Sequence, residues 1–94
     1  MKFQIILNRD GGTLRTLDLE QFESELRAVL QAAGHQVDVS VIEGAELERR
    51  LDNALASDCD VVMVGGGDGS ISAAASRMKG SDKALAILPA GTMN

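Results

Sequence analysis

The feature that most constrains the fold is the run at 61–70, which reads VVMVGGGDGS. Its first four residues are apolar, as in a strand covered on both faces, and four of the next five are glycines. After this run, the apolar residues at positions 71, 74, 75 and 78 follow the spacing of one helix face. The segment therefore predicts a buried strand, a glycine-rich turn and a helix in succession.

The glycine-rich turn has two interpretations. One or two glycines would suit a tight turn with positive φ angles. Four glycines within five residues leave backbone N–H groups unobstructed at the positive end of a helix dipole, which favours a phosphate-binding loop. The candidate ligands are the backbone and side-chain groups of Gly65, Gly66, Gly67, Asp68, Gly69 and Ser70.

Strand and helix patterns alternate along the rest of the chain. Apolar runs predict strands at 3–7 and 84–88, and alternating valines predict a strand with one polar face at 36–42. Helical spacing begins at the capping residue Asp18 and ends before Gly34, and a second helical pattern covers 44–55. The predicted order of elements is βαβαβαβ.

This alternation predicts a three-layer α/β/α fold of the Rossmann-like kind, with a parallel sheet of about four strands and helices on both faces. The strand at 36–42 belongs near an edge, and the expected strand order is 2-1-3-4. Ligands of such sheets bind beyond the carboxyl ends of the strands, where the strand order reverses. Three glycine-containing loops should meet there, at 8–12, 65–69 and 89–94.

Composition excludes several classes of function. The 94 residues suffice for one small domain, and a net charge of −5 with 2% aromatic residues argues against nucleic acid as a partner. The apolar runs are far shorter than the ~20 residues of a membrane-spanning helix. One cysteine, with no visible signal peptide, fits a reducing compartment, and we expect a cytoplasmic protein.

Two common phosphate-binding motifs do not match the glycine loop. A Walker A loop needs a lysine before its Ser or Thr, and no lysine lies in or just after 65–70. The dinucleotide fingerprint fails because its third glycine position falls on Ser70 or Ser72. An ordinary P-loop enzyme or dehydrogenase is therefore not expected.

A third motif does match. The segment 66–70 (GGDGS) resembles the Gly-Gly-Asp-Gly-Thr/Ser motif shared by diacylglycerol kinases, sphingosine and ceramide kinases, NAD kinases and phosphofructokinases. The segment 91–94 (GTMN) resembles the Gly-Thr-x-Asn segment of the diacylglycerol-kinase catalytic family, and Asn8 with Gly11 and Gly12 is similar to its first-strand loop. Because the three motifs occur in the family's order over the whole chain, the sequence is identified as a member of that family, with its NAD kinase–diacylglycerol kinase-like N-terminal fold.

The resemblance implies a kinase that transfers the γ-phosphoryl group of ATP to a lipid hydroxyl, with Mg²⁺ as cofactor. For Asp68 two roles stay open, as a ligand of Mg²⁺ or of metal-bound water, or as a turn residue that accepts backbone N–H groups. The resemblance further implies that the nucleotide side of the cleft is lined by Asn8, Gly12, Gly91, Thr92 and Asn94.

The resemblance also implies that 1–94 is the N-terminal nucleotide-binding subdomain of a longer enzyme. A second, mainly β domain is expected to supply the lipid site and the catalytic carboxylate, so the 94 residues alone are expected to be inactive. Peripheral contact with a membrane stays open, and an exposed edge of the fourth strand is expected to favour a homodimer. The alternatives are an NAD kinase or sugar-phosphate kinase, and a non-enzymatic nucleotide-binding module.

Overall fold

The computed structural model describes residues 1–10 and 18–88. Strands and helices alternate through this part of the chain, as the sequence predicts. The elements are β1 (Lys2–Asn8), α1 (Leu19–Ala32), β2 (Gln36–Ile42), the 3₁₀ turn η2 (Gly44–Glu46), α2 (Leu47–Ala56), β3 (Val61–Gly65), α3 (Asp68–Arg77) and β4 (Ala84–Leu88).

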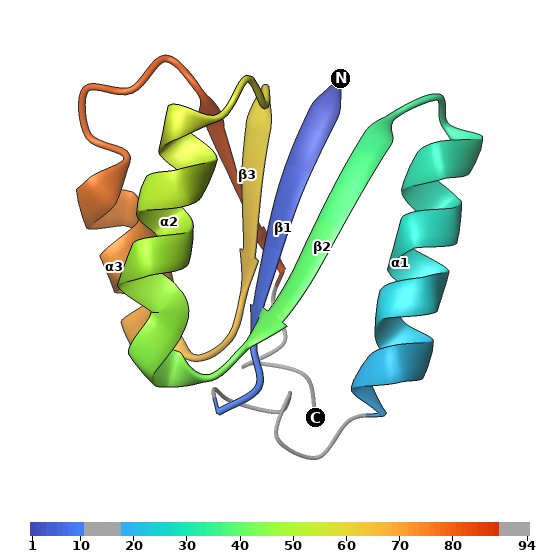
Figure 1. The fold of residues 1–94 in the computed structure, drawn as a ribbon, viewed down its shortest axis with the longest axis horizontal. Coiled ribbons are helices and arrows are strands. Elements are labelled where there is room, and N and C mark those ends of the chain that lie inside the picture. Colours follow the sequence, from blue (N-terminus) through green and yellow to red (C-terminus); the bar gives the residue numbers. More distant parts are fainter. Residues whose placement is uncertain (11–17, 89–94) are drawn as a thin grey trace.

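The four strands form one parallel sheet in the order β2-β1-β3-β4, which confirms the predicted topology. Helix α1 lies on one face of the sheet, and α2 and α3 lie together on the other (Figure 1). This is the predicted three-layer α/β/α arrangement. The half-polar strand β2 is at an edge, because its alternating polar residues could not be covered on both faces.

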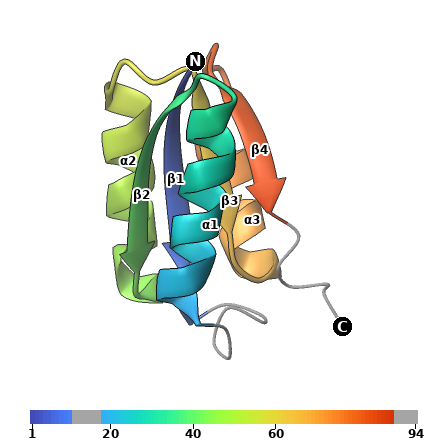
Figure 2. The same cartoon turned by 90° about the vertical axis from the view of Figure 1, so that its right-hand side faces the viewer.

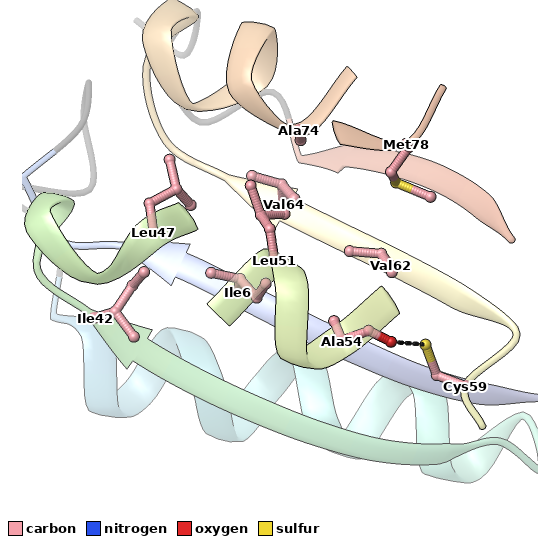
Figure 3. Close-up of a cluster of buried hydrophobic side chains, with 10 residues drawn as sticks. All are labelled: Ile6, Ile42, Leu47, Leu51, Ala54, Cys59, Val62, Val64, Ala74 and Met78. Atoms are coloured by element: carbon pink, nitrogen blue, oxygen red, sulfur yellow. Dashed lines mark hydrogen bonds between the residues drawn. The ribbon is translucent and has the colours of Figure 1, made fainter. Parts of the chain in front are cut away.

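The larger part of the core lies between the sheet and the pair α2 and α3 (Figure 3). Val62 and Val64 of β3 are fully buried there against Leu51 of α2, because alternate strand residues point to the same face. On the opposite face, Ile5 and Leu7 of β1 pack under α1. Both faces of the central strands are therefore apolar, as the continuous apolar runs predict.

Local capping explains where the first helix begins and ends. The carboxylate of Asp18 accepts a hydrogen bond of 3.2 Å from the backbone N–H of Gln21, which satisfies one free donor of the first turn. Gly34 follows the helix with a φ of +91°, a conformation that glycine adopts without strain. Both residues act as the sequence predicts.

The amino-terminal ends of the strands are tied together by polar contacts. The backbone N–H of Lys2 donates to the carboxylate of Asp60, and the ammonium of Lys83 donates to the carbonyls of Ser57 and Cys59 at 2.8 Å each. This end of the sheet is thus held by internal hydrogen bonds, and the glycine-rich loop lies at the opposite end (Figure 2). None of the helices in the described ranges has both the length and the apolar character needed to cross a membrane.

Candidate functional site

The carboxyl ends of the four strands meet at one edge of the sheet. Asn8 of β1 lies in register with Ile42 of β2, and the preceding residue Leu7 lies in register with Gly65 of β3. Gly65 in turn pairs with Leu88, the last residue of β4. The loop after β3 therefore begins beside the end of β1, as expected for a site at the reversal of strand order.

The glycine loop is shorter than the sequence suggests, because α3 begins at Asp68 rather than near Ser70. Gly67 is the N-cap, and the first helical bonds run from the N–H groups of Ser70 and Ile71 to its carbonyl, at 3.1 and 3.2 Å. The N–H groups at 68 and 69 precede these bonds and have no acceptor inside the helix. Since a glycine N-cap has no side chain to satisfy them, they can bind an anion.

Close packing, and not backbone conformation, explains two of the loop glycines. Among the described residues only Gly34 and Gly80 have positive φ angles, so the interpretation as a turn with positive φ does not apply to this loop. A Cβ added at Gly65 would lie 2.9 Å from the side chain of Leu7, and one at Gly66 would lie 2.7 Å from the hydroxyl oxygen of Ser70. No side chain larger than hydrogen fits at either position without movement of a neighbour.

A buried hydrogen bond joins the end of β1 to the first turn of α3. The side-chain Nδ2 of Asn8 donates to Oγ of Ser70 at 2.8 Å, and the two residues are only 8% and 5% exposed. Oδ1 of Asn8 accepts from the backbone N–H of Asp10 at 3.0 Å. Two predicted site residues that are far apart in the sequence are thus in direct contact beside the loop.

Asp10 connects two loops at this end of the sheet, a role that the sequence did not indicate. Its carboxylate accepts a hydrogen bond of 2.8 Å from the backbone N–H of Gly44, the first residue of η2. Glu43, the N-cap of η2, makes no side-chain capping bond, so Asp10 supplies the cap from another loop. The only sequence signal was a short-range one, an Asn-x-Asp turn directly after a strand.

Asp68 is exposed in the first turn of α3, where a negative charge is favoured by the helix dipole. Within the described ranges its carboxylate accepts no hydrogen bond, and both the metal role and the turn role stay predictions. No group of three or more potential metal-ligating side chains occurs in that part of the chain. A single carboxylate is compatible with Mg²⁺, because this ion takes one or two carboxylates together with phosphates and water.

Several predicted site residues lie outside the described residues. These are Gly12 in the loop after β1, and Gly91, Thr92 and Asn94 after β4. Their proposed contacts with a nucleotide stay predictions. The site residues that the structure does describe are Asn8, Gly65, Gly66, Gly67, Asp68, Gly69 and Ser70, and all of them lie at the carboxyl end of β1 or between β3 and the first turn of α3.

Comparison with known proteins identifies relatives over almost the whole chain. The family model of the diacylglycerol kinase catalytic domain matches residues 2–94. A protein of Klebsiella pneumoniae (strain 342), named "Probable lipid kinase YegS-like", is 39% identical over 96% of this chain. A protein of the same name from Shewanella frigidimarina (strain NCIMB 400) is 35% identical over 97% of this chain. The chain spans 29% of the length of each relative.

A solved structure of a proposed diacylglycerol kinase from Bacillus anthracis str. Sterne has the same fold. Its TM-score is 0.73 at 23% sequence identity, and the match covers 99% of this chain and 32% of that chain. The family match, the two relatives and the shared fold agree with one another and with the three sequence motifs. The chain belongs to the diacylglycerol kinase catalytic domain family.

Proposed function

We propose that the chain is the ATP-binding half of a lipid kinase, which transfers the γ-phosphoryl group of ATP to a lipid hydroxyl. The observation that carries this proposal is the glycine-capped start of α3, beside the buried Asn8–Ser70 hydrogen bond: within residues 1–10 and 18–88, no capping side chain satisfies its first N–H groups. In a chain of this family, that arrangement suits the phosphates of a nucleotide.

The residues of the loop would bind and orient the phosphates. Backbone N–H groups at 68 and 69 would donate to phosphate oxygens, and the hydroxyl of Ser70 would add a donor from the same turn. The exposed carboxylate of Asp68 would hold Mg²⁺ or a water bound to it. When bound, the metal would neutralise charge that develops on the transferred group.

The proposed reaction forms a bond between the lipid hydroxyl oxygen and the γ-phosphorus, while the bond from that phosphorus to the β–γ bridging oxygen breaks. ADP leaves with that oxygen, and the hydroxyl proton passes to a base. We expect that base and the lipid site in a second, mainly β domain beyond residue 94. This division of labour is in keeping with the fraction of each relative that the chain spans.

The lipid acceptor is supported by the printed name of both relatives, "Probable lipid kinase YegS-like". An NAD kinase or a sugar-phosphate kinase would bind the nucleotide with a similar glycine loop and transfer the phosphoryl group to another acceptor. A nucleotide-binding module would bind the nucleotide without transferring the phosphoryl group. The family match favours the lipid kinase over both alternatives.

The test uses the full-length protein with γ-labelled ATP, Mg²⁺ and a panel of acceptors in mixed micelles. The panel holds diacylglycerol, sphingosine, ceramide and phosphatidylglycerol beside NAD and fructose 6-phosphate. We expect label in a lipid product, and we expect Asp68→Asn to lower the rate at least tenfold, as for a lost charge-assisted interaction. Label in NAD or the sugar phosphate alone, or ATP binding without any transfer, would overturn the lipid-kinase assignment.

A further inference from the structure

The side-chain amide of Asn8 lies between two partners of different kinds. The backbone N–H of Asp10 can only donate, and it approaches Oδ1 of Asn8 at 3.0 Å. Because this contact determines which end of the amide carries the oxygen, the other end must donate to Ser70. The backbone thus sets the direction of the Asn8–Ser70 hydrogen bond.

That direction determines where the hydroxyl hydrogen of Ser70 can point. Oγ accepts from Asn8, so its own hydrogen is not used in this bond and remains able to donate to another group. Within residues 1–10 and 18–88 no acceptor for this hydrogen is recorded, although Ser70 is only 5% exposed. A buried donor without an acceptor costs free energy, so an oxygen brought to the loop by a ligand would be a favoured partner.

The turn that follows Asn8 is held in place by two hydrogen bonds. The backbone N–H of Arg9 donates to the carbonyl of Ile42 at 2.9 Å, and the carboxylate of Asp10 accepts from the N–H of Gly44 at 2.8 Å. On the other side, the backbone of Gly66 passes so close that an added Cβ would lie 3.3 Å from Cβ of Asn8. The amide therefore has little freedom to turn over or withdraw.

We propose that Asn8 is a positioning residue that acts through Ser70, directing the Ser70 hydroxyl hydrogen toward a phosphate oxygen on the glycine loop. The inference rests on the proposed nucleotide-binding function and changes one detail of it. The sequence resemblance implied a direct contact of Asn8 with the nucleotide, whereas here both ends of the Asn8 amide already have protein partners.

A double-mutant cycle on the full-length protein separates the two roles of Asn8. Dissociation constants of MgATP are measured by calorimetry for the wild type, Asn8→Ala, Ser70→Ala and the double variant. We expect each single variant to weaken binding by about tenfold to hundredfold, the range for a hydrogen bond to a charged group. If Asn8 acts through Ser70, the double variant binds no more weakly than Ser70→Ala alone.

Conservative variants and controls keep the result interpretable. Ser70→Thr keeps the hydroxyl and should bind MgATP as the wild type does. Asn8→Asp keeps the shape and the bond from Asp10, but its carboxylate would accept the Ser70 hydrogen and should weaken binding, so it replaces Asn8→Ala if that variant does not fold. The exposed residues Asn53 and Ser76 provide matched controls, and Asn53→Ala and Ser76→Ala should leave affinity unchanged.

The possible failures are distinct. Wild-type protein that does not bind MgATP overturns the proposed function itself. Binding with additive losses in the cycle overturns only the positioning role, because it means that Asn8 contacts the nucleotide independently of Ser70. Unchanged affinity of a folded Asn8 variant also overturns the positioning role.

Discussion

At the scale of single residues, Gly66 has little room for a side chain. In Gly66→Ala the new Cβ would lie 2.7 Å from Oγ and 3.0 Å from Cβ of Ser70. Rotation of the Ser70 side chain would relieve the closer contact only by breaking the hydrogen bond to Asn8. We expect a loss of about 1–3 kcal/mol in the free energy of unfolding, measured by chemical denaturation.

Gly69 provides the matched control for this prediction. It lies in the same loop-to-helix segment, but apart from its chain neighbours and the backbone of its own helix, no atom of the described residues lies within 4 Å of its Cβ position, and its φ is not positive. Gly69→Ala should therefore be neutral or more stable by about 0.4–1 kcal/mol, because alanine restricts the unfolded chain. Equal destabilisation by both substitutions would show that the contact with Ser70 is not the cause.

A second residue-scale prediction concerns Lys2 and Asp58, whose side chains form an ion pair. The hydrogen bond from Lys2, and then its charge, lower the pKa of the Asp58 carboxyl. A carboxyl whose pKa is lowered by folding adds stability above its unfolded pKa of about 3.9, and this is lost as pH falls through the folded pKa. Because both side chains are exposed, we expect a small effect that is weakened by salt.

The measurement compares thermal unfolding of the wild type and Asp58→Asn between about pH 6 and about pH 3. The wild type should be slightly more stable at the upper end, and the difference should decrease toward the lower end. The exposed Asp82→Asn serves as a control that lacks this partner in the described ranges. A difference that grows on acidification would have the wrong sign for the proposed cause.

At the scale of elements, α1 depends on its cap more than the other helices do. None of its residues is fully buried, so it is held by partly buried contacts on one face and by the bond from Gln21 to Asp18. Asp18→Ala should reduce the free energy of unfolding by about 0.5–2 kcal/mol, as measured by urea denaturation. Asp18→Ser keeps a capping oxygen and should cost little, so equal losses in both variants would argue against the cap.

The start of α3 shows why element boundaries matter for the site. Sequence periodicity places apolar residues from Ile71 onward on one face, but the helix extends two residues before Ser70, to Asp68. Asp68 gains from the positive end of the helix dipole, and the N-cap Gly67 has no side chain to cap the first N–H groups. The loop thereby becomes short, and its free N–H groups belong to the helix itself.

At the scale of the whole molecule, β4 is an edge strand of the described sheet. Its Ile87 is 45% exposed, and an unprotected apolar edge can pair with a second chain. We predict that residues 1–94, when produced alone, form dimers at high concentration through this edge. Sedimentation velocity over a range of concentrations is the measurement.

Two lysine substitutions make this prediction specific. Ile87→Lys should shift the 94-residue chain to monomer, because a charged side chain on an edge disfavours strand pairing. Val29→Lys is the control, since Val29 is 67% exposed on α1 and not on the β4 edge. Wild-type chain that stays monomeric, or an equal response to both substitutions, would contradict edge pairing.

The fold and the place of the site were predictable because both follow from short-range patterns. Hydrophobic periodicity distinguishes strands from helices, and strict alternation of the two leaves a parallel sheet with right-handed crossovers as the main solution. The half-polar strand at Gln36–Ile42 was expected near an edge, and the order 2-1-3-4, which fits that position, is the one observed. Because the glycine loop directly follows a strand of a parallel sheet, it had to lie at the edge where the carboxyl ends of the strands meet.

The contacts within the site were not predictable in this way. Asn8 and Ser70 are 62 positions apart and Asp10 and Gly44 are 34 apart, so no local pattern links them. The sequence also could not distinguish a glycine that is required for a positive φ from one that is required because a neighbouring side chain leaves no room for a Cβ. Both are simply glycine in the sequence. Only the tertiary structure places Ser70 against Gly66 and Asn8.

By itself, then, the sequence determined the class of fold, the family and the edge of the sheet at which the candidate site lies. The tertiary structure decided which of the described side chains at that edge have protein partners and which residues those partners are. The physical reason is that periodicity and turn chemistry act over a few residues, whereas burial and hydrogen bonding at a site depend on chain segments that only the packed sheet brings together.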